Sequence, residues 1–113
     1  MIKNLSRKTA LSKDIRFCRS AMSKFLGLMF SKNHKATLVF EFAEEQFISL
    51  HMIFVFYPID VIFLDKKKIV VDLKENFKPF TFYASKRKAI YVVELPKGAI
   101  TKSKTKIGDR IRF

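Results

Sequence analysis

The stretch "ISLHMIFVFYPIDVIFL", residues 48–64, decides the fold class, because it fits either a membrane span or buried strands. A spanning helix needs roughly 20 apolar residues, and a carboxylate at its centre costs several kcal/mol. This stretch is interrupted by Pro58 and Asp60, and proline disrupts both helix interiors and central strands. Its Ile, Val, Phe and Tyr residues favour strands. We therefore expect two strands, at about 50–56 and 60–65, with a bend at 57–59.

The flanking sequence continues the strand pattern. "ATLVFEF" (36–42) alternates apolar and polar positions as a half-buried strand does, and "AEEQ" (43–46) is expected to be a polar connection. "DKKK" (65–68) predicts a turn into a further strand within 69–76, with Asp72 and Lys74 facing outward. Other strands are expected at 2–5, within 10–18, at 89–96 and at the C-terminal end.

Helical signals are short. Met22, Phe25, Leu26 and Met29 follow helical spacing after a capping Ser20, and one helical turn is expected after Gly98. A parallel α/β fold is disfavoured, because the strands from 37 to 76 leave no room for crossover helices. The sequence thus predicts a mainly β fold, a small barrel or sandwich of seven to eight short, mostly antiparallel strands with one short helix.

The length and composition of the chain indicate a single, strongly basic domain. The 113 residues fit a single domain, 1–113, and 49% of them are hydrophobic, so the chain can form a core. The formal net charge is +13, and it is unevenly distributed. Residues 36–65 contain no Lys or Arg, whereas the segments on both sides are rich in them. This layout predicts core strands in the middle of the chain and cations on the elements around them.

Cysteine content and the N-terminal sequence indicate a cytoplasmic protein. Cys18 is the single cysteine, so no internal disulfide forms and no metal site is built from paired thiolates. Residues 1–17 contain no apolar run of the length that a signal peptide needs. We therefore expect a cytoplasmic protein without a membrane anchor or cofactor, as a monomer or small homo-oligomer.

Several motifs together carry a family resemblance. They are "GLMF" (27–30), "HMIFVFYPIDVIFLD" (51–65), "KENFKPF" (74–80), "YVVELPKG" (91–98) and "IGDRI" (107–111). In their order and spacing they resemble the domain of unknown function 192 family of archaeal and bacterial proteins, over almost the whole chain. The resemblance implies a mostly β domain with a small helix, and it implies no established activity.

The chain also departs from that family. Leu26 and Ser31 stand where members commonly have arginines around the Gly-Leu-Met-Phe motif. Residues 51–55, His-Met-Ile-Phe-Val, replace the Trp-Met-Lys-Asn-Thr of many bacterial members. The resemblance therefore implies that a polar pocket built from those bacterial side chains is not intact in this protein.

Three residues are candidates for a cleft. His51 and Asp60 could act as a base with its orienter or as two metal ligands if their strands lie side by side. Alternatively, His51 lies at the edge of the core and Asp60 accepts backbone N–H groups at the bend. Glu94 interrupts "YVVELP" and needs a partner, either a Lys or Arg at the rim or a polar cleft. No nucleophile with a flanking base and no glycine-rich phosphate loop supports an enzyme.

Clusters of cations are the remaining functional signal. The candidates for anion binding are Lys66, Lys67, Lys68, Lys86, Arg87 and Lys88, with a further cluster at Lys102, Lys104 and Lys106. Phe80, Phe82 and Tyr83 precede the second cluster, and lysines beside aromatic rings are typical of grooves for single-stranded nucleic acid. A lysine-rich surface also arises simply as solubilising composition. The leading hypothesis is a noncatalytic binding module, with nucleic acid or another polyanion as partner; the alternative is a small-molecule or metal-dependent function at the His51, Asp60 and Glu94 cleft.

Overall fold

A computed structural model describes residues 1–13, 15–18, 37–51 and 57–113, with only the backbone of Cys18 and His51 described. The described strands are β1 (Ile2–Asn4), β2 (Thr9–Ser12), β3 (Ile15–Cys18), β4 (Thr37–Gln46), β5 (Ser49–His51), β6 (Ile59–Leu64), β7 (Val70–Phe77), β8 (Phe82–Ala84), β9 (Ala89–Pro96) and β10 (Ile111–Arg112). One short helix, α2 (Ala99–Ser103), precedes the last strand. The predicted mainly β fold with a short helix is confirmed, with more strands than expected.

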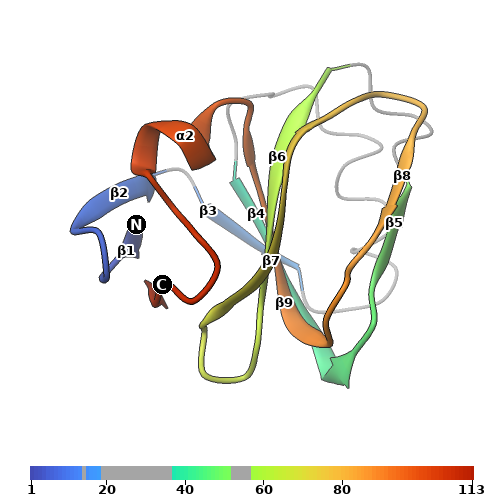
Figure 1. Ribbon diagram of the computed structural model, residues 1–113, viewed down its shortest axis with the longest axis horizontal. Coiled ribbons are helices and arrows are strands. Elements are labelled where there is room, and N and C mark those ends of the chain that lie inside the picture. Colours follow the sequence, from blue (N-terminus) through green and yellow to red (C-terminus); the bar gives the residue numbers. More distant parts are fainter. Residues whose placement is uncertain (14, 19–36, 52–56) are drawn as a thin grey trace.

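The strands form three open sheets, and none of the sheets described closes into a barrel. A central five-stranded sheet has the order β3-β4-β9-β6-β7, a three-stranded sheet has the order β10-β1-β2, and β5 pairs with β8. Figure 1 shows the three-stranded sheet and α2 on one side of the central sheet, and the β5–β8 pair on the other. The β3–β4 pair is parallel and the remaining strand pairs are antiparallel, as predicted for most of them.

The centre of the molecule is the pair β6 and β9. All six residues of β6 are buried, because the strand lies between β9 and β7 and both of its faces are covered. Such a strand is a continuous apolar run rather than an alternating one, which explains the membrane-like composition of the end of the 48–64 stretch. Proline at position 58 directly precedes this strand, a position that central sheets tolerate.

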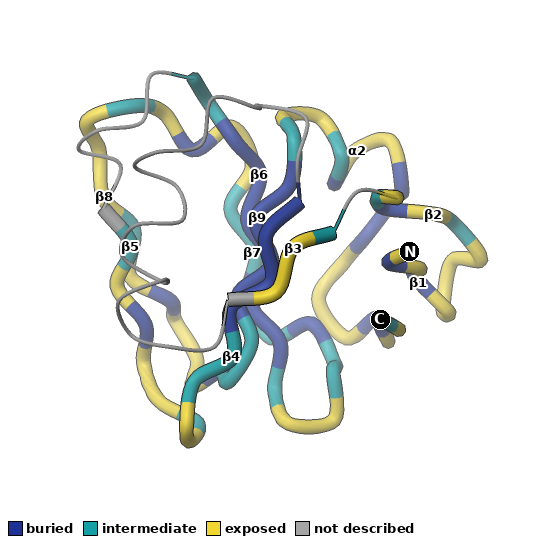
Figure 2. The backbone as a smooth tube through the Cα atoms, turned by 180° about the vertical axis from the view of Figure 1, so that it is seen from behind, coloured by how far each residue is buried: buried dark blue, intermediate teal, exposed yellow. Residues whose placement is uncertain are grey.

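Two apolar clusters lie on the two faces of the central sheet. Figure 2 shows that the strands of this sheet contain many of the buried residues. One contains Phe40, Val61, Phe63 and Phe77 and extends to Tyr83 of β8. The other contains Val39, Ile62 and Leu95 and extends to Ile2 of β1 and Ile100 of α2. Neighbouring residues of β4 and β6 thus contribute to different clusters, as the period of two in a strand requires.

The structure corrects three details of the predicted strands. The strand at 36–42 continues through the expected polar connection, so β4 reaches Gln46, and its first four residues are buried on both faces. In β7, Asp72 pairs with Phe63 and is 4% exposed, because Tyr83 of β8 lies against this face of the central sheet. Both faces of the strand are therefore covered, and the outward prediction for Asp72 is wrong.

The helical turn predicted after Gly98 is confirmed as α2. Gly98 has a φ of 92°, a left-handed conformation that glycine adopts without steric cost. The helix predicted from Ser20 lies outside the described residues. Within the ranges that the structure describes, no helix is long and apolar enough to cross a membrane.

Candidate functional site

The two acidic cleft candidates point to opposite faces of the central sheet. Asp60 of β6 pairs with Leu95, whereas the next residue, Val61, pairs with Glu94 of β9. Directly paired residues share a face, and consecutive residues of a strand alternate between faces. Asp60 and Glu94 therefore do not share a cleft, and the separation follows from a register that the sequence alone does not give.

His51 is placed by its backbone in a different sheet. It ends β5 and pairs with Phe82 of β8, so its strand does not pair with that of Asp60. The side chain of His51 lies outside the described residues, and its predicted approach to Asp60 stays a prediction. Among the residues described with their side chains, no group of three His, Cys, Asp or Glu residues could hold a metal ion.

Asp60 is 1% exposed and accepts hydrogen bonds from three backbone N–H groups. Its Oδ1 accepts from Asn76 N at 3.0 Å, and its Oδ2 accepts from Gly98 N at 3.1 Å and Ile100 N at 2.9 Å. Gly98 has no side chain to cap α2, so the Asp60 carboxylate caps the helix from a neighbouring strand. These contacts hold together β6, β7 and α2, in line with the alternative that Asp60 accepts backbone N–H groups.

Glu94 differs from Asp60 in its hydrogen bonding. The residue is 3% exposed, and its buried Oε2 has no hydrogen-bond partner among the described residues. No Lys or Arg of the described ranges forms an ion pair with it. Burial disfavours the charged carboxylate and raises the pKa of Glu94 well above its ordinary value of 4.5. The group is therefore stabilised in its neutral form, which can donate as well as accept a hydrogen bond.

Asp72 and Tyr83 form a polar pair that the sequence did not indicate. The Tyr83 hydroxyl donates to Asp72 Oδ2 at 2.8 Å, and the same oxygen accepts from Lys86 N at 2.9 Å. Burial, this hydrogen bond and the charge of Asp72 raise the pKa of Tyr83 to about 12. Tyr83 packs against Phe63 and Phe77 at ring distances of 5.8 and 6.4 Å, so it faces the core rather than solvent.

In the first lysine cluster, one of the three side chains, that of Lys68, makes contacts within the protein. Lys68 places its Nζ 4.0 Å from the ring centroid of Phe113 and donates to the Phe113 carbonyl at 3.3 Å. The backbone N–H of Lys66 donates to Glu45 Oε2 at 3.2 Å, which brings a carboxylate next to this turn. Lys66 and Lys67 are exposed, but the adjacent acidic side chain weakens their attraction for anions.

The second cluster differs in its surroundings. Lys86, Arg87 and Lys88 are all exposed, and they follow β8 directly. Phe80 and Phe82, just before them, are 68% and 73% exposed. Phe47 is 62% exposed and lies with its ring centroid 6.0 Å from Lys88 Nζ. We call Phe47, Phe80, Phe82, Lys86, Arg87 and Lys88 the β8 surface.

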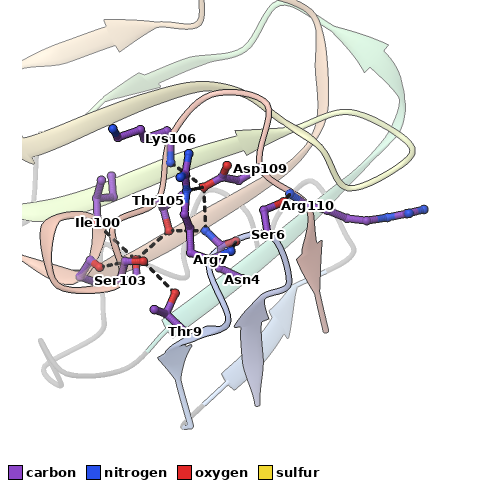
Figure 3. A network of polar contacts seen from close by, with 11 residues as sticks. Asn4, Ser6, Arg7, Thr9, Ile100, Ser103, Thr105, Lys106, Asp109 and Arg110 are labelled. Atoms are coloured by element: carbon purple, nitrogen blue, oxygen red, sulfur yellow. Dashed lines mark hydrogen bonds and ion pairs between the residues drawn. The ribbon is translucent and has the colours of Figure 1, made fainter.

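A third polar region joins the two ends of the chain. Figure 3 shows Asp109 among side chains of the N-terminal hairpin and the loop after α2. Asp109 Oδ2 accepts from Asn4 Nδ2 and Arg7 Nε at 3.0 Å each, and from Lys106 N at 2.9 Å. Burial opposes ionisation of Asp109, but these hydrogen bonds outweigh it and lower the pKa below the ordinary 3.8.

The fold and these sites describe a mainly β protein with buried carboxyl groups between its layers and cations on its surface. Its sequence matches the model of the DUF192 family, described as "Uncharacterized ACR", over residues 2–113, and the chain belongs to this family. The resemblance seen in the motifs is thereby confirmed.

Relatives and solved structures agree with this assignment. The UPF0127 protein of Pyrococcus furiosus is 39% identical over 97% of this chain and 95% of its own length, and that of Pyrococcus horikoshii is 38% identical over 100% and 98%. A crystal structure of a protein of unknown function from Novosphingobium aromaticivorans superposes with a TM-score of 0.79 at 20% identity, covering 88% of this chain and 74% of that one. A crystal structure from Sinorhizobium meliloti, described as a candidate transcription regulator, gives a TM-score of 0.80 at 22% identity, covering 87% and 79%. At these identities the two structures show the fold alone.

Proposed function

We propose that the protein is a noncatalytic binding module and that the β8 surface binds single-stranded nucleic acid. The observation that carries the proposal is the exposure of Phe80 and Phe82, 68% and 73%, next to three consecutive exposed cations. Exposed rings provide stacking platforms for bases, and neighbouring cations attract phosphates. The two requirements of a single-stranded site thus occur together within nine residues, 80–88.

The backbone of Phe80 supports a role for its ring. Phe80 has a φ of 62°, in the left-handed region that bulky side chains rarely adopt. Such a conformation costs on the order of 1 kcal/mol or more. Glycine or asparagine would relieve this strain, whereas phenylalanine at this position places an aromatic side chain at the surface, 68% exposed.

The β8 surface is also held in position from below. Tyr83, between Phe82 and Ala84, points inward and binds Asp72, while Lys86 N binds the same carboxylate. Ser85 accepts from Ile48 N at 2.9 Å and donates to the Arg87 carbonyl at 2.9 Å. These anchors fix the backbone between the rings and the cations, so a bound strand would order few additional residues.

Fluorescence polarisation with labelled single-stranded DNA and RNA of ~20 nucleotides tests the proposal directly. If the three cations neutralise three phosphates, log K falls with log salt at a slope of about −2, since each single-strand phosphate contributes about −0.7. Raising the salt from ~50 to ~200 mM then weakens binding about twentyfold. Absence of binding at the lower salt concentration would refute the proposal.

Two variants locate the site. Removing the cations in the triple variant Lys86→Gln, Arg87→Gln and Lys88→Gln should abolish most of the salt dependence. The matched control Lys97→Gln, Lys102→Gln and Arg112→Gln removes the same charge from exposed positions outside the β8 surface and should retain most binding. Phe82→Ala should weaken binding about 5- to 150-fold, the range that corresponds to about 1–3 kcal/mol for one lost stacking contact. An equal loss of affinity in both triple variants would show that the nucleic acid does not bind specifically at the β8 surface.

A further inference from the structure

A groove lies outside the β8 surface and shares no residue with it. The groove lies beside α2, has a volume of about 740 Å³, and is lined in part by Arg7, Glu75, Thr101, Lys104, Lys106 and Ile107. Leu73 and Ile100 contribute apolar side chains to it. Ile107 is 63% exposed and adds a further apolar side chain to the groove.

Arg7 is held in place with its outer nitrogens available. Its backbone N–H donates to Asn4 Oδ1 at 3.0 Å, and its Nε donates to Asp109 Oδ2 at 3.0 Å. Asp109 is 6% exposed at its side chain, so the guanidinium is anchored on a buried carboxylate, while the Arg7 side chain is 40% exposed. Within the described ranges, its two terminal nitrogens donate no hydrogen bond to protein. An arginine fixed through Nε presents these two donors as a fork that matches an oxyanion.

Two lysines add positive charge to the same groove. Lys104 and Lys106 are exposed and form no ion pair with any described residue. Lys104 ends α2 with a φ of 59°, at a position that glycine usually occupies. The one carboxylate lining the groove, Glu75, accepts a hydrogen bond from the Thr101 hydroxyl at 2.6 Å. Three cations therefore line the groove with one anion. Even when the negative charge of Asp109 beneath Arg7 is counted as well, the net charge around the groove is positive.

We propose that this groove binds a small organic oxyanion, with the carboxylate or phosphate group on Arg7, Lys104 and Lys106 and the apolar body against Ile100 and Ile107. The combination of a preorganised arginine, unpaired lysines and apolar walls in one groove carries the inference. Small-molecule sites have this character, mostly apolar walls with a few convergent polar groups. The site is separate from the β8 surface, so it neither requires nor excludes nucleic-acid binding.

Titrations of the ¹⁵N-labelled 113-residue chain, followed by amide chemical shifts, test the groove with three probes of similar size. Hexanoate and hexyl phosphate carry an oxyanion on an apolar chain, and hexanol carries the chain alone. We expect saturable shifts at residues 7, 75 and 100–107 with at least one anion, and binding of hexanol at least tenfold weaker. The tighter of the two anions identifies the head group. Equal binding of hexanol, or shifts spread over the whole surface, would overturn the proposal.

Variants separate binding from folding. Arg7→Gln should weaken the anion at least tenfold, but it also removes the contact with Asp109 and could unfold the protein. Lys104→Gln combined with Lys106→Gln leaves that contact in place and should weaken the anion several-fold. Lys102→Gln and Lys97→Gln remove the same charge from exposed positions that do not line the groove and should leave affinity unchanged. Unchanged affinity in the Lys104 and Lys106 variant would contradict the assignment, whatever the behaviour of Arg7→Gln.

Discussion

Asp60 and Glu94 are two buried carboxyl groups on neighbouring strands, and their surroundings are opposite. They are 1% and 3% exposed and point to different faces of the central sheet. Asp60 lies at the start of β6, next to a bulge in β7 and the first turn of α2, where backbone N–H groups are not used by strand pairing. Glu94 lies within β9, between β4 and β6, where the surrounding N–H groups belong to the sheet.

Burial alone does not determine what a carboxyl group does in a protein. A carboxylate that meets unpaired donors stabilises several elements at once, whereas one without donors costs free energy unless it takes up a proton. Asp109 and Asp72 resemble Asp60 in this respect, because each accepts several hydrogen bonds. Glu94 is the exception among the buried carboxyl groups that the structure describes.

Removal of the Asp60 carboxylate should have the largest effect. Asp60→Ala leaves the N–H groups of Asn76, Gly98 and Ile100 without their acceptor, and each buried donor left unpaired costs about 1–3 kcal/mol. We expect the free energy of unfolding to fall by roughly 3–5 kcal/mol in urea denaturation. Asp60→Asn keeps one carbonyl acceptor and should lose about half as much. A loss below about 1 kcal/mol in Asp60→Ala would show that water replaces the carboxylate.

Substitution of Glu94 should have the opposite sign. Glu94→Gln keeps the shape and is neutral at every pH, so the variant does not bear the free-energy cost of keeping a proton on Glu94, or of burying its charge, at pH 7. The free energy of unfolding at pH 7 should therefore rise, by about 1 kcal/mol or more. Because the pKa of Glu94 is raised in the folded state, folding favours the protonated form. The wild type should therefore lose stability as the pH rises above 4.5, until the pH passes the folded pKa.

The Gln variant should lack this loss, so the two stability curves should diverge as the pH rises from 4 to 8. Urea denaturation at a series of pH values measures the difference directly. Parallel curves, or a less stable variant at pH 7, would indicate that Glu94 is charged and paired in the folded protein. In that event the contrast with Asp60 would disappear.

The local patterns of apolar and turn-forming residues predicted the positions of several strands and turns correctly. The bend at 57–59, the turn at 65–68 and the strand at 89–96 all correspond to observed elements. The extension of β4 through Glu44 and Glu45 was missed, because exposed strand ends tolerate charged residues. The pairing of β5 with β8 was also out of reach, since it joins segments more than 30 residues apart through few residues.

The candidate sites were predicted less completely, because they depend on contacts between segments that are far apart in the sequence. The sequence identified Asp60 and Glu94 as notable, but the register that turns them to opposite faces depends on how β6 pairs with β9, segments more than 30 residues apart. Asp72 was predicted to face outward because one face of its strand was assumed to be open to solvent, whereas Tyr83 of β8 covers that face. The anchoring of Arg7 on Asp109 links residues 102 positions apart, and no local pattern indicates such a contact.

The smallest of the three expected effects concerns Tyr83, which tests whether Asp72 behaves as Asp60 does. Tyr83→Phe removes one of the hydrogen bonds to Asp72, while Leu73 N and Lys86 N still donate to it. We expect a loss of about 1 kcal/mol, typical of a single hydrogen bond. A loss much larger than this would mean that Tyr83 is the main hydrogen-bond donor to Asp72. Without Tyr83, the Asp72 carboxylate would then lack sufficient donors, as the Glu94 carboxyl group does.

The pH dependence of the same variant gives a second measurement. The pKa of Tyr83 is raised from 10.0 to about 12 in the folded protein, so the unfolded chain loses this proton first. The stability that Tyr83 contributes is present below pH 10 and is lost as the pH rises toward 12. Other tyrosines and the lysines titrate in the same range, so the informative quantity is the difference between wild type and Tyr83→Phe. That difference should shrink, and then change sign, between pH 10 and 12, because the wild type alone must keep a proton on residue 83 or bury its charge beside Asp72.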